Sequence, residues 1–165
     1  MSVEITAHGS RCGSVVGRVL DANAMDVQER TAILLIDDDA DMHLVVTAVL
    51  AGPGCEVRCC TTGEAGLEAM RRQRPALVLL DIMLAAPTEG LQVACQMRQD
   101  ARLKDIPIIF MSAIGETYGA EYAREVCPVS LDADMFLEKP FDATTLREAV
   151  KWVLSQKPIG NAPPP

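Results

Sequence analysis

Short apolar runs alternate along the chain with longer segments in which apolar residues recur every three or four positions. Five runs predict strands: Thr31–Ile36, Cys55–Cys60, Pro75–Asp81, Ile106–Met111 and Asp134–Glu138. The first, third and fourth runs are almost wholly apolar, which is typical of strands buried on both faces of a parallel sheet. The second run alternates only weakly around Val57, which favours an outer strand.

Helical spacing fills the segments between these strands. A helix over Asp39–Ala51 is expected to begin at Asp39 as its N-cap and to end at the Gly-Pro-Gly sequence of residues 52–54. Its inward face is predicted to carry Leu44, Val45, Ala48 and Val49. Thr61 or Thr62 is expected to cap a second helix, which finishes in the basic run of residues 71–74.

Three further helices complete the alternation. One carries Leu91, Val93, Ala94 and Met97; one covers Gly115–Val126; and the last begins near Asp142, its expected cap, and buries Leu146, Val150, Val153 and Leu154. Strands that alternate with helices imply right-handed βαβ units. The predicted fold class is therefore α/β, a three-layer, doubly wound sandwich around a five-stranded parallel sheet.

The 165 residues suit one domain. We expect it to span residues 31–156, after a flexible N-terminal segment of residues 1–30, in which Met25 is a plausible second start. The tail of residues 157–165 closes in three prolines and is not expected to continue the last helix.

Charge and composition exclude several partners. The net charge of −8 argues against nucleic acid, which Lys and Arg side chains bind through its phosphates. No segment approaches the ~18 apolar residues of a membrane span, so a cytoplasmic protein without a membrane partner is expected. None of the six cysteines forms a C-x-x-C pair, which makes a zinc site unlikely and reduced, buried thiols the expectation.

Polar residues follow the predicted strands where a parallel sheet presents its carboxyl edge. Asp37 and Asp38 follow the first strand, Asp81 ends the third, and the fourth and fifth are followed by Ser112 and Lys139. Ligands of open α/β sheets bind at this edge. Three carboxylates together repel one another, and a hard cation such as Mg²⁺ would neutralise them. A lysine and a hydroxyl beside that cation suit phosphoryl transfer to Asp81.

With these motifs in order, residues from about Ala32 to Leu154 resemble the receiver domain of two-component response regulators. The matching stretches are Ile33–Asp39, Leu77–Leu84, Met111–Ala113 and Phe136–Pro140. The resemblance implies a flavodoxin-like sheet with strand order 2-1-3-4-5. It also implies a phosphorylation-controlled signalling switch that takes its phosphoryl group from a sensor histidine kinase or a histidine phosphotransfer protein.

The resemblance also assigns roles to single residues. Asp81 would be the phosphoacceptor, and Mg²⁺, for which Mn²⁺ can substitute, would be held by Asp37, Asp38, Asp81 and the backbone carbonyl of Met83. Ser112 would be the switch hydroxyl and Lys139 the lysine that pairs with the phosphoryl group. Phe136 matches the switch aromatic of the family, although an aromatic residue in a strand is as often plain core.

Two segments depart from the family pattern. After the phosphoacceptor the family usually has a proline four residues on and then a glycine, whereas here Ala85 holds the first place, Pro87 comes later and Gly90 is displaced by one residue. The segment between Ser112 and Lys139 is several residues longer than usual. A changed partner face, with an unusual partner or no standard dimer, is therefore expected.

The interpretation is a stand-alone receiver that signals through protein contacts to an unknown partner and is no enzyme beyond its own phosphorylation and dephosphorylation. The apolar Met83 and Ile114 are expected to hinder attacking water and prolong the phosphorylated form. A non-phosphorylated binding module remains the alternative. A dehalogenase-type phosphatase needs a second acid where this chain has Met83, and a redox role needs a paired, low-pKa thiol.

Overall fold

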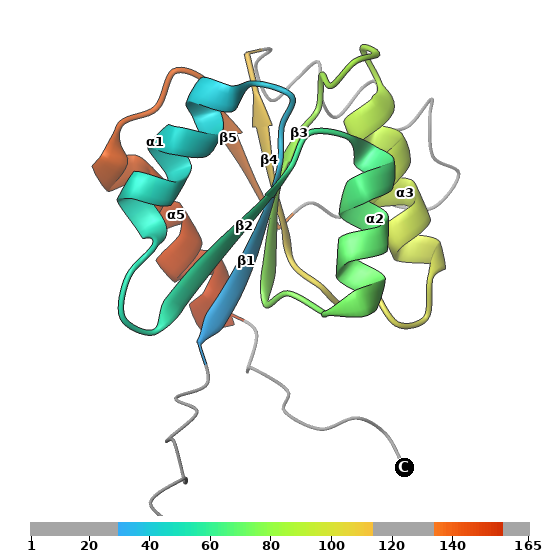
Figure 1. Cartoon of the computed structure of the whole chain (residues 1–165), viewed down its shortest axis with the longest axis horizontal. Helices are drawn as coiled ribbons and strands as arrows, with labels where there is room; N and C mark the ends of the chain where they lie inside the picture. The colour runs from blue at the N-terminus through green and yellow to red at the C-terminus, as the bar shows by residue number, and fades with distance from the viewer. Residues whose placement is uncertain (1–29, 114–133, 157–165) are drawn as a thin grey trace, which may run out of the picture.

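The computed structural model describes residues 30–113 and 134–156. Their strands form one sheet: β1 (Thr31–Ile36), β2 (Cys55–Cys60), β3 (Leu77–Asp81), β4 (Ile108–Ser112) and β5 (Met135–Glu138). Every neighbouring pair is parallel, and the order is β2-β1-β3-β4-β5 (Figure 1). The predicted parallel sheet and its strand order are confirmed.

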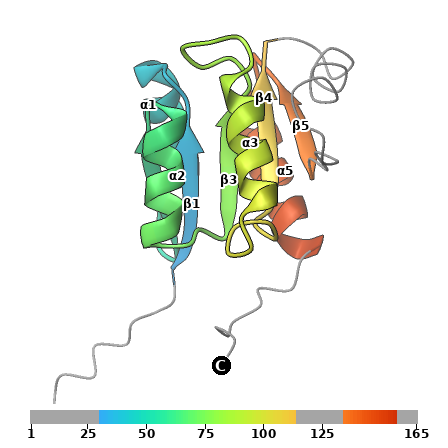
Figure 2. The ribbon, with the colours of Figure 1, turned by 90° about the vertical axis from the view of Figure 1, so that its right-hand side faces the viewer.

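The described helices cover both faces of this sheet. They are α1 (Ala40–Leu50), α2 (Gly63–Arg72), α3 (Glu89–Gln99) and α5 (Ala143–Gln156). Helices α1 and α5 lie on one face and α2 and α3 on the other, as Figures 1 and 2 show, which confirms the three-layer sandwich. The helix predicted over Gly115–Val126 lies outside the described residues. Among the described helices, none has the length and apolar character needed to cross a membrane.

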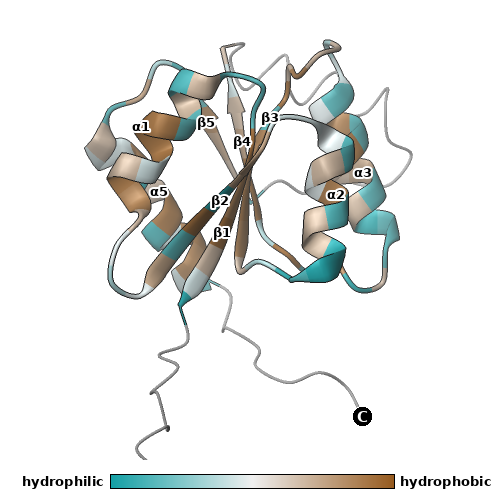
Figure 3. Ribbon diagram, viewed as in Figure 1, coloured by the Kyte–Doolittle hydropathy of each residue, from teal (hydrophilic) through white to brown (hydrophobic). Residues whose placement is uncertain are grey.

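The central strands are apolar on both sides because each side faces a helical layer. In β1, Leu34 and Ile36 pack into the cluster beneath α2 and α3, whereas Ile33 and Leu35 pack into the cluster beneath α1 and α5. Every residue of β3 is buried. Figure 3 shows the hydrophobic colour running along these strands. Two cores on one sheet therefore account for the unbroken apolar runs.

Side-chain caps begin three helices where the sequence predicts them. Asp39 Oδ1 accepts a hydrogen bond of 2.8 Å from the Asp41 amide, and Thr62 Oγ1 accepts one of 3.2 Å from the Ala65 amide. Asp142 Oδ1 accepts one of 2.8 Å from the Thr145 amide, and this hydrogen bond to the backbone lowers the pKa of Asp142. Asp39 is therefore a helix cap, as predicted.

The predicted inward face of α1 is confirmed for Val49, which packs against the core, and is wrong for Leu44, Val45 and Ala48. Leu44 and Val45 are 70% and 48% exposed, and Val46 is the buried residue of this helix. Nearly every position from Met42 to Leu50 is apolar, so several stripes of helical spacing compete and the sequence does not select one. As a result α1 presents an apolar outer face, which Figure 3 shows in brown.

The expectation of reduced, buried cysteines is half right for Cys55, Cys59 and Cys60, because they are free but Cys59 is exposed and the other two are only partly buried. The expected reduced state is wrong for Cys95. Cys95, on α3, is disulfide-bonded, and its partner lies outside the described residues. Burial raises the pKa of the Cys55 and Cys60 thiols, which makes them poor nucleophiles at neutral pH. The spacing of the cysteines in the sequence did not predict this disulfide.

Helix α2 approaches β1 closely at Gly66, and this contact yields a stability prediction. A Cβ atom at residue 66 would lie 2.3 Å from Cδ1 of Ile36 and 2.8 Å from its Cγ1. Overpacking of this kind costs about 1–3 kcal/mol, so Gly66→Ala should lower the free energy of unfolding by that amount in urea titrations. Ile36→Val removes Cδ1, and the double variant should be less destabilised than the sum of the two single variants. Strict additivity would contradict the contact.

Candidate functional site

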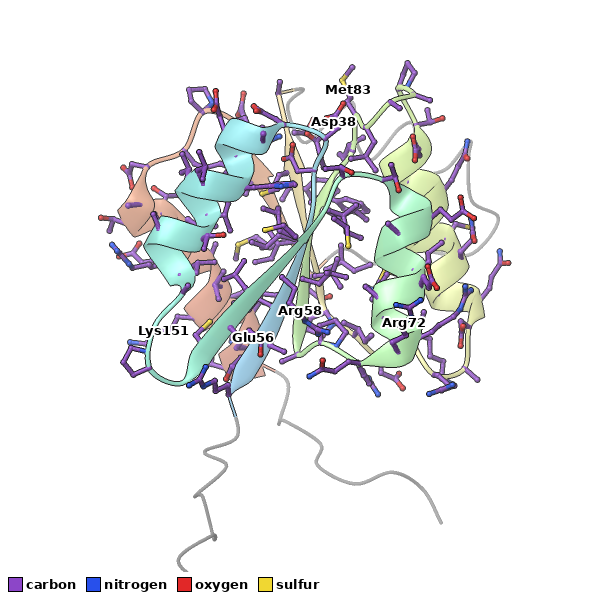
Figure 4. The ribbon with its side chains drawn as sticks, viewed as in Figure 1. Asp38, Glu56, Arg58, Arg72, Met83 and Lys151 are labelled. Atoms are coloured by element: carbon purple, nitrogen blue, oxygen red, sulfur yellow. The ribbon has the colours of Figure 1, made fainter. Side chains whose placement is uncertain are left out.

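The carboxyl edge of the sheet gathers the residues predicted for it. Asp37 and Asp38 follow β1, Asp81 ends β3, Ser112 ends β4 and Lys139 follows β5. Carboxylate oxygens of Asp37, Asp38 and Asp81 lie within 4.8 Å of one another. Figure 4 shows Asp38 and Met83 at this edge of the sheet, in the loops after β1 and β3.

Lys139 joins the two buried acids of this cluster. Its Nζ atom donates to Asp37 Oδ2 at 2.8 Å and to Asp81 Oδ2 at 2.5 Å. Asp37 is fully buried and Asp81 is 7% exposed, so both ion pairs lie where water screens them poorly. The lysine thus crosses from the end of β5 to the ends of β1 and β3 and neutralises part of the charge there.

Burial and pairing act on these groups in opposite directions. Burial raises the pKa of Asp81, and the hydrogen bonds from Lys139 and from the Met83 amide offset only part of that rise. Burial alone would lower the pKa of Lys139, but its hydrogen bonds to Asp37 and Asp81 outweigh it and raise this pKa. The charged form of Lys139 is therefore stabilised, whereas the ionised form of Asp81 is destabilised by its removal from water.

The donor set fits a hard divalent cation. All three side chains offer carboxylate oxygens, which Mg²⁺ and Mn²⁺ prefer as ligands. Asp81 Oδ1 accepts a 2.8 Å hydrogen bond from the Met83 amide, which places residue 83 at the cluster. Asp38 is exposed and, within the described part of the chain, its side chain makes no hydrogen bond or ion pair. The carbonyl of Met83 remains a predicted ligand.

Gly90, which is displaced by one residue from the family pattern, packs against the backbone of Asp81. Its amide donates to the Ile82 carbonyl at 3.2 Å. A Cβ atom at residue 90 would lie 1.9 Å from the Asp81 carbonyl oxygen, so no other residue fits against the backbone of Asp81 without moving it. Residues 85–87 of the same loop are exposed, so the close contact of Gly90 with the backbone of Asp81 is kept in a loop that departs from the family pattern.

A family model places the chain among known proteins. The model for the response regulator receiver domain matches residues 33–151. The chain belongs to the response regulator receiver domain family. All of the residues collected at the carboxyl edge of the sheet fall within the matched range.

Named relatives of this receiver domain are longer proteins. It is 34% identical over 122 residues to the DNA-binding response regulator MtrA of Mycobacterium bovis, which covers 74% of this chain and 50% of MtrA. It is 29% identical over 130 residues to the response regulator Rre1 of Synechocystis, covering 78% of this chain and 54% of Rre1. The chain thus spans about half the length of the curated relatives it matches.

Solved structures agree with this assignment. The receiver domain of NtrX from Brucella abortus is 27% identical, with a TM-score of 0.64 over 76% of this chain and 99% of that domain. A protein described as a response regulator from Chloroflexus aurantiacus is 28% identical, with a TM-score of 0.66 over 76% of this chain and 98% of its own.

Two predicted switch residues of the receiver domain occupy neighbouring strands. Ser112 is buried, and its carbonyl accepts a 2.8 Å hydrogen bond from the Lys139 amide. Phe136 is partly buried and stacks on Phe110, with ring centroids 5.3 Å apart. Phe110 was not singled out in the sequence, although its position two residues before Ser112 pairs it directly with Phe136.

Two further residues at the site escaped the sequence interpretation. His43 Nε2 lies 2.7 Å from the Asp37 carbonyl oxygen, and Glu89 Oε1 accepts a 3.2 Å hydrogen bond from the Gly63 amide at the start of α2. Both contacts join segments whose relative position depends on tertiary structure. The sequence offered one signal for the first contact: His43 lies one helical turn after the predicted cap Asp39.

The raised pKa of Asp81 gives a pH prediction for the metal-free protein. Between pH 3.8, the ordinary pKa, and the raised folded value, the folded state holds more protons on this group than the unfolded chain. The stability contributed by Asp81 therefore falls as the pH rises through this window. Asp81→Asn should raise the free energy of unfolding at pH 7, and its advantage should shrink toward pH 4, in urea titrations with a chelator. A variant less stable than wild type at pH 7 would contradict this balance.

Proposed function

We propose that this receiver domain accepts a phosphoryl group on Asp81 in a Mg²⁺-dependent reaction and acts as a phosphorylation-controlled signalling switch. One observation carries the proposal: a buried carboxylate at the carboxyl edge of the sheet lies between a lysine ammonium and two further acids. A structural salt bridge needs one acid for one lysine, whereas this cluster holds an excess of negative charge. Such an excess suits a divalent cation, whose positive charge would in turn neutralise the oxygens of an incoming phosphoryl group.

The roles of the acids follow from their positions. Asp37, Asp38, Asp81 and the Met83 carbonyl would hold Mg²⁺, which supplies charge neutralisation to the phosphoryl oxygens when bound. A carboxylate oxygen of Asp81 attacks phosphorus in line, so the new O–P bond forms as the bond between phosphorus and the donor's histidine nitrogen breaks. The Met83 amide, which donates to Asp81 Oδ1, orients the carboxylate for that attack.

Lys139 and Ser112 would bind the phosphoryl group once it is attached to Asp81. Lys139 already donates to Asp81 Oδ2, and we propose that it turns to the phosphoryl oxygens once they are in place. The Ser112 hydroxyl would donate to the same group. Their movement would alter the neighbouring Phe136, and so bias a two-state surface that a partner protein reads.

The donor is proposed to be a sensor histidine kinase or a histidine phosphotransfer protein. Its phosphohistidine must reach Asp81, so the surface beside the site has to receive the donor protein. Helix α1 begins two residues after Asp38 and exposes Leu44 and Val45. These two adjacent apolar side chains lie on the helix that follows the acid pair, and contiguous exposed apolar surface marks protein interfaces.

Phosphorylation itself is the test of the proposed function. Incubation with acetyl phosphate and Mg²⁺ should add the mass of one phosphoryl group, and chelation of the metal should prevent the gain. Asp81→Asn should abolish it because the nucleophile is lost. Asp142→Asn, which changes an exposed acid at the start of α5, is the matched control and should retain it. No gain in the wild type, or an equal gain in Asp81→Asn, would refute the proposal.

The proposed docking surface gives a separate prediction. Leu44→Asp should slow phosphoryl transfer from a donor protein about tenfold, since loss of one well-packed interface residue commonly costs that much. Its labelling by acetyl phosphate should remain unchanged, because the small donor needs no docking. Trp152→Glu, on α5 and 50% exposed, is the control and should transfer at the wild-type rate. A Leu44→Asp variant that transfers normally would exclude this face of α1.

A further inference from the structure

His43 reaches back from α1 to the loop that carries the two adjacent acids. Its Nε2 atom lies 2.7 Å from the backbone carbonyl oxygen of Asp37. A carbonyl oxygen can only accept a hydrogen bond, so Nε2 carries the hydrogen and the imidazole donates. The side chain is partly buried, which shelters this contact from competing water.

This hydrogen bond is the last of four that fix Asp37. Its amide donates to the Cys60 carbonyl at 3.0 Å. Its carboxylate accepts from the Asp39 amide at 2.9 Å and from Lys139 Nζ at 2.8 Å. No backbone amide of the described residues donates to its carbonyl. Because Asp37 is fully buried, a carbonyl without the imidazole would lose a hydrogen bond that water replaces poorly.

The same carbonyl belongs to the peptide that leads into Asp38. A peptide group is planar, so holding its oxygen also fixes the direction in which the chain enters Asp38. The Asp38 side chain is exposed and, among the described residues, has no hydrogen bond or ion pair of its own. Its aim toward Asp37 and Asp81 therefore depends on the backbone that His43 holds.

We propose that His43 is a positioning residue for the divalent cation: it clamps the Asp37–Asp38 peptide and thereby keeps the Asp38 carboxylate aimed into the site. The inference rests on the proposed function, because it requires that the three acids bind a cation. His43 does not touch the ion. Its role resembles that of other groups that orient metal ligands through hydrogen bonds, whose loss typically weakens metal binding about 10- to 100-fold.

The test measures Mg²⁺ affinity by calorimetry on the full chain at one fixed pH. His43→Leu removes the donor and should weaken binding about tenfold. His43→Gln keeps an N–H donor of similar reach and should recover most of the affinity. Thr47→Leu, an exposed position one turn further along α1, is the matched control and should bind as the wild type does. The urea midpoint of the metal-free variants separates this role from a merely structural one, which would lower the midpoint without weakening Mg²⁺ binding by the chain that is still folded.

Each result decides between the two proposals. Wild type that binds no Mg²⁺ overturns the cation site and the inference with it. Normal binding by both the wild type and His43→Leu overturns the inference alone, as does an equal loss in the Leu and Gln variants. If the Leu variant fails to fold, the wild-type Nε2 proton is followed by NMR. It should exchange slowly with water and more slowly with Mg²⁺, and rapid exchange in both conditions would overturn the clamp.

Discussion

The ion pairs of Lys139 with Asp37 and Asp81 are the interaction on which the rest of the site depends. They connect the ends of three strands that are far apart in the sequence, and they do so where both carboxylates are shielded from water. Removal of Lys139 would leave two buried carboxylates without their opposite charge, and a loss of this kind costs about 3–5 kcal/mol. The fold therefore tolerates the acid cluster because the Lys139 ammonium group neutralises part of its charge. Because three acids face this single lysine, the cluster can bind a further positive charge.

In the proposed switch, this unequal balance of charge is what phosphorylation of Asp81 would change. The pairing raises the pKa of Lys139, whereas burial raises that of Asp81, so the metal-free state is a compromise between charge attraction and desolvation. Any group that adds or removes charge at Asp81 must change the contacts of Lys139. The Lys139 amide also donates to the Ser112 carbonyl, which joins the ends of β4 and β5, the two strands in which Phe136 packs on Phe110.

The apolar runs and the residues after them were sufficient to predict the sheet and its edge. A strand buried on both faces has few alternatives, and Asp81, Ser112 and Lys139 could be assigned to one edge because parallel strands end together. Helix α1 was predicted to face the core with Leu44 and Val45, and both are exposed, because an almost uniformly apolar helix carries no signal of its orientation. His43 was missed for a related reason. Its contact with Asp37 depends on how α1 is oriented relative to the loop that precedes it, and the spacing of residues in the sequence does not give that orientation.

The most direct measurement locates the phosphoryl group on the chain. Borohydride reduces an aspartyl phosphate to homoserine, and peptide mapping by mass spectrometry then identifies the modified position. After incubation with acetyl phosphate and Mg²⁺, the account predicts homoserine at residue 81, with Asp37, Asp38 and Asp39 unmodified. Homoserine at any of these neighbouring acids, or none at residue 81 in a protein that has gained a phosphoryl group, would contradict it.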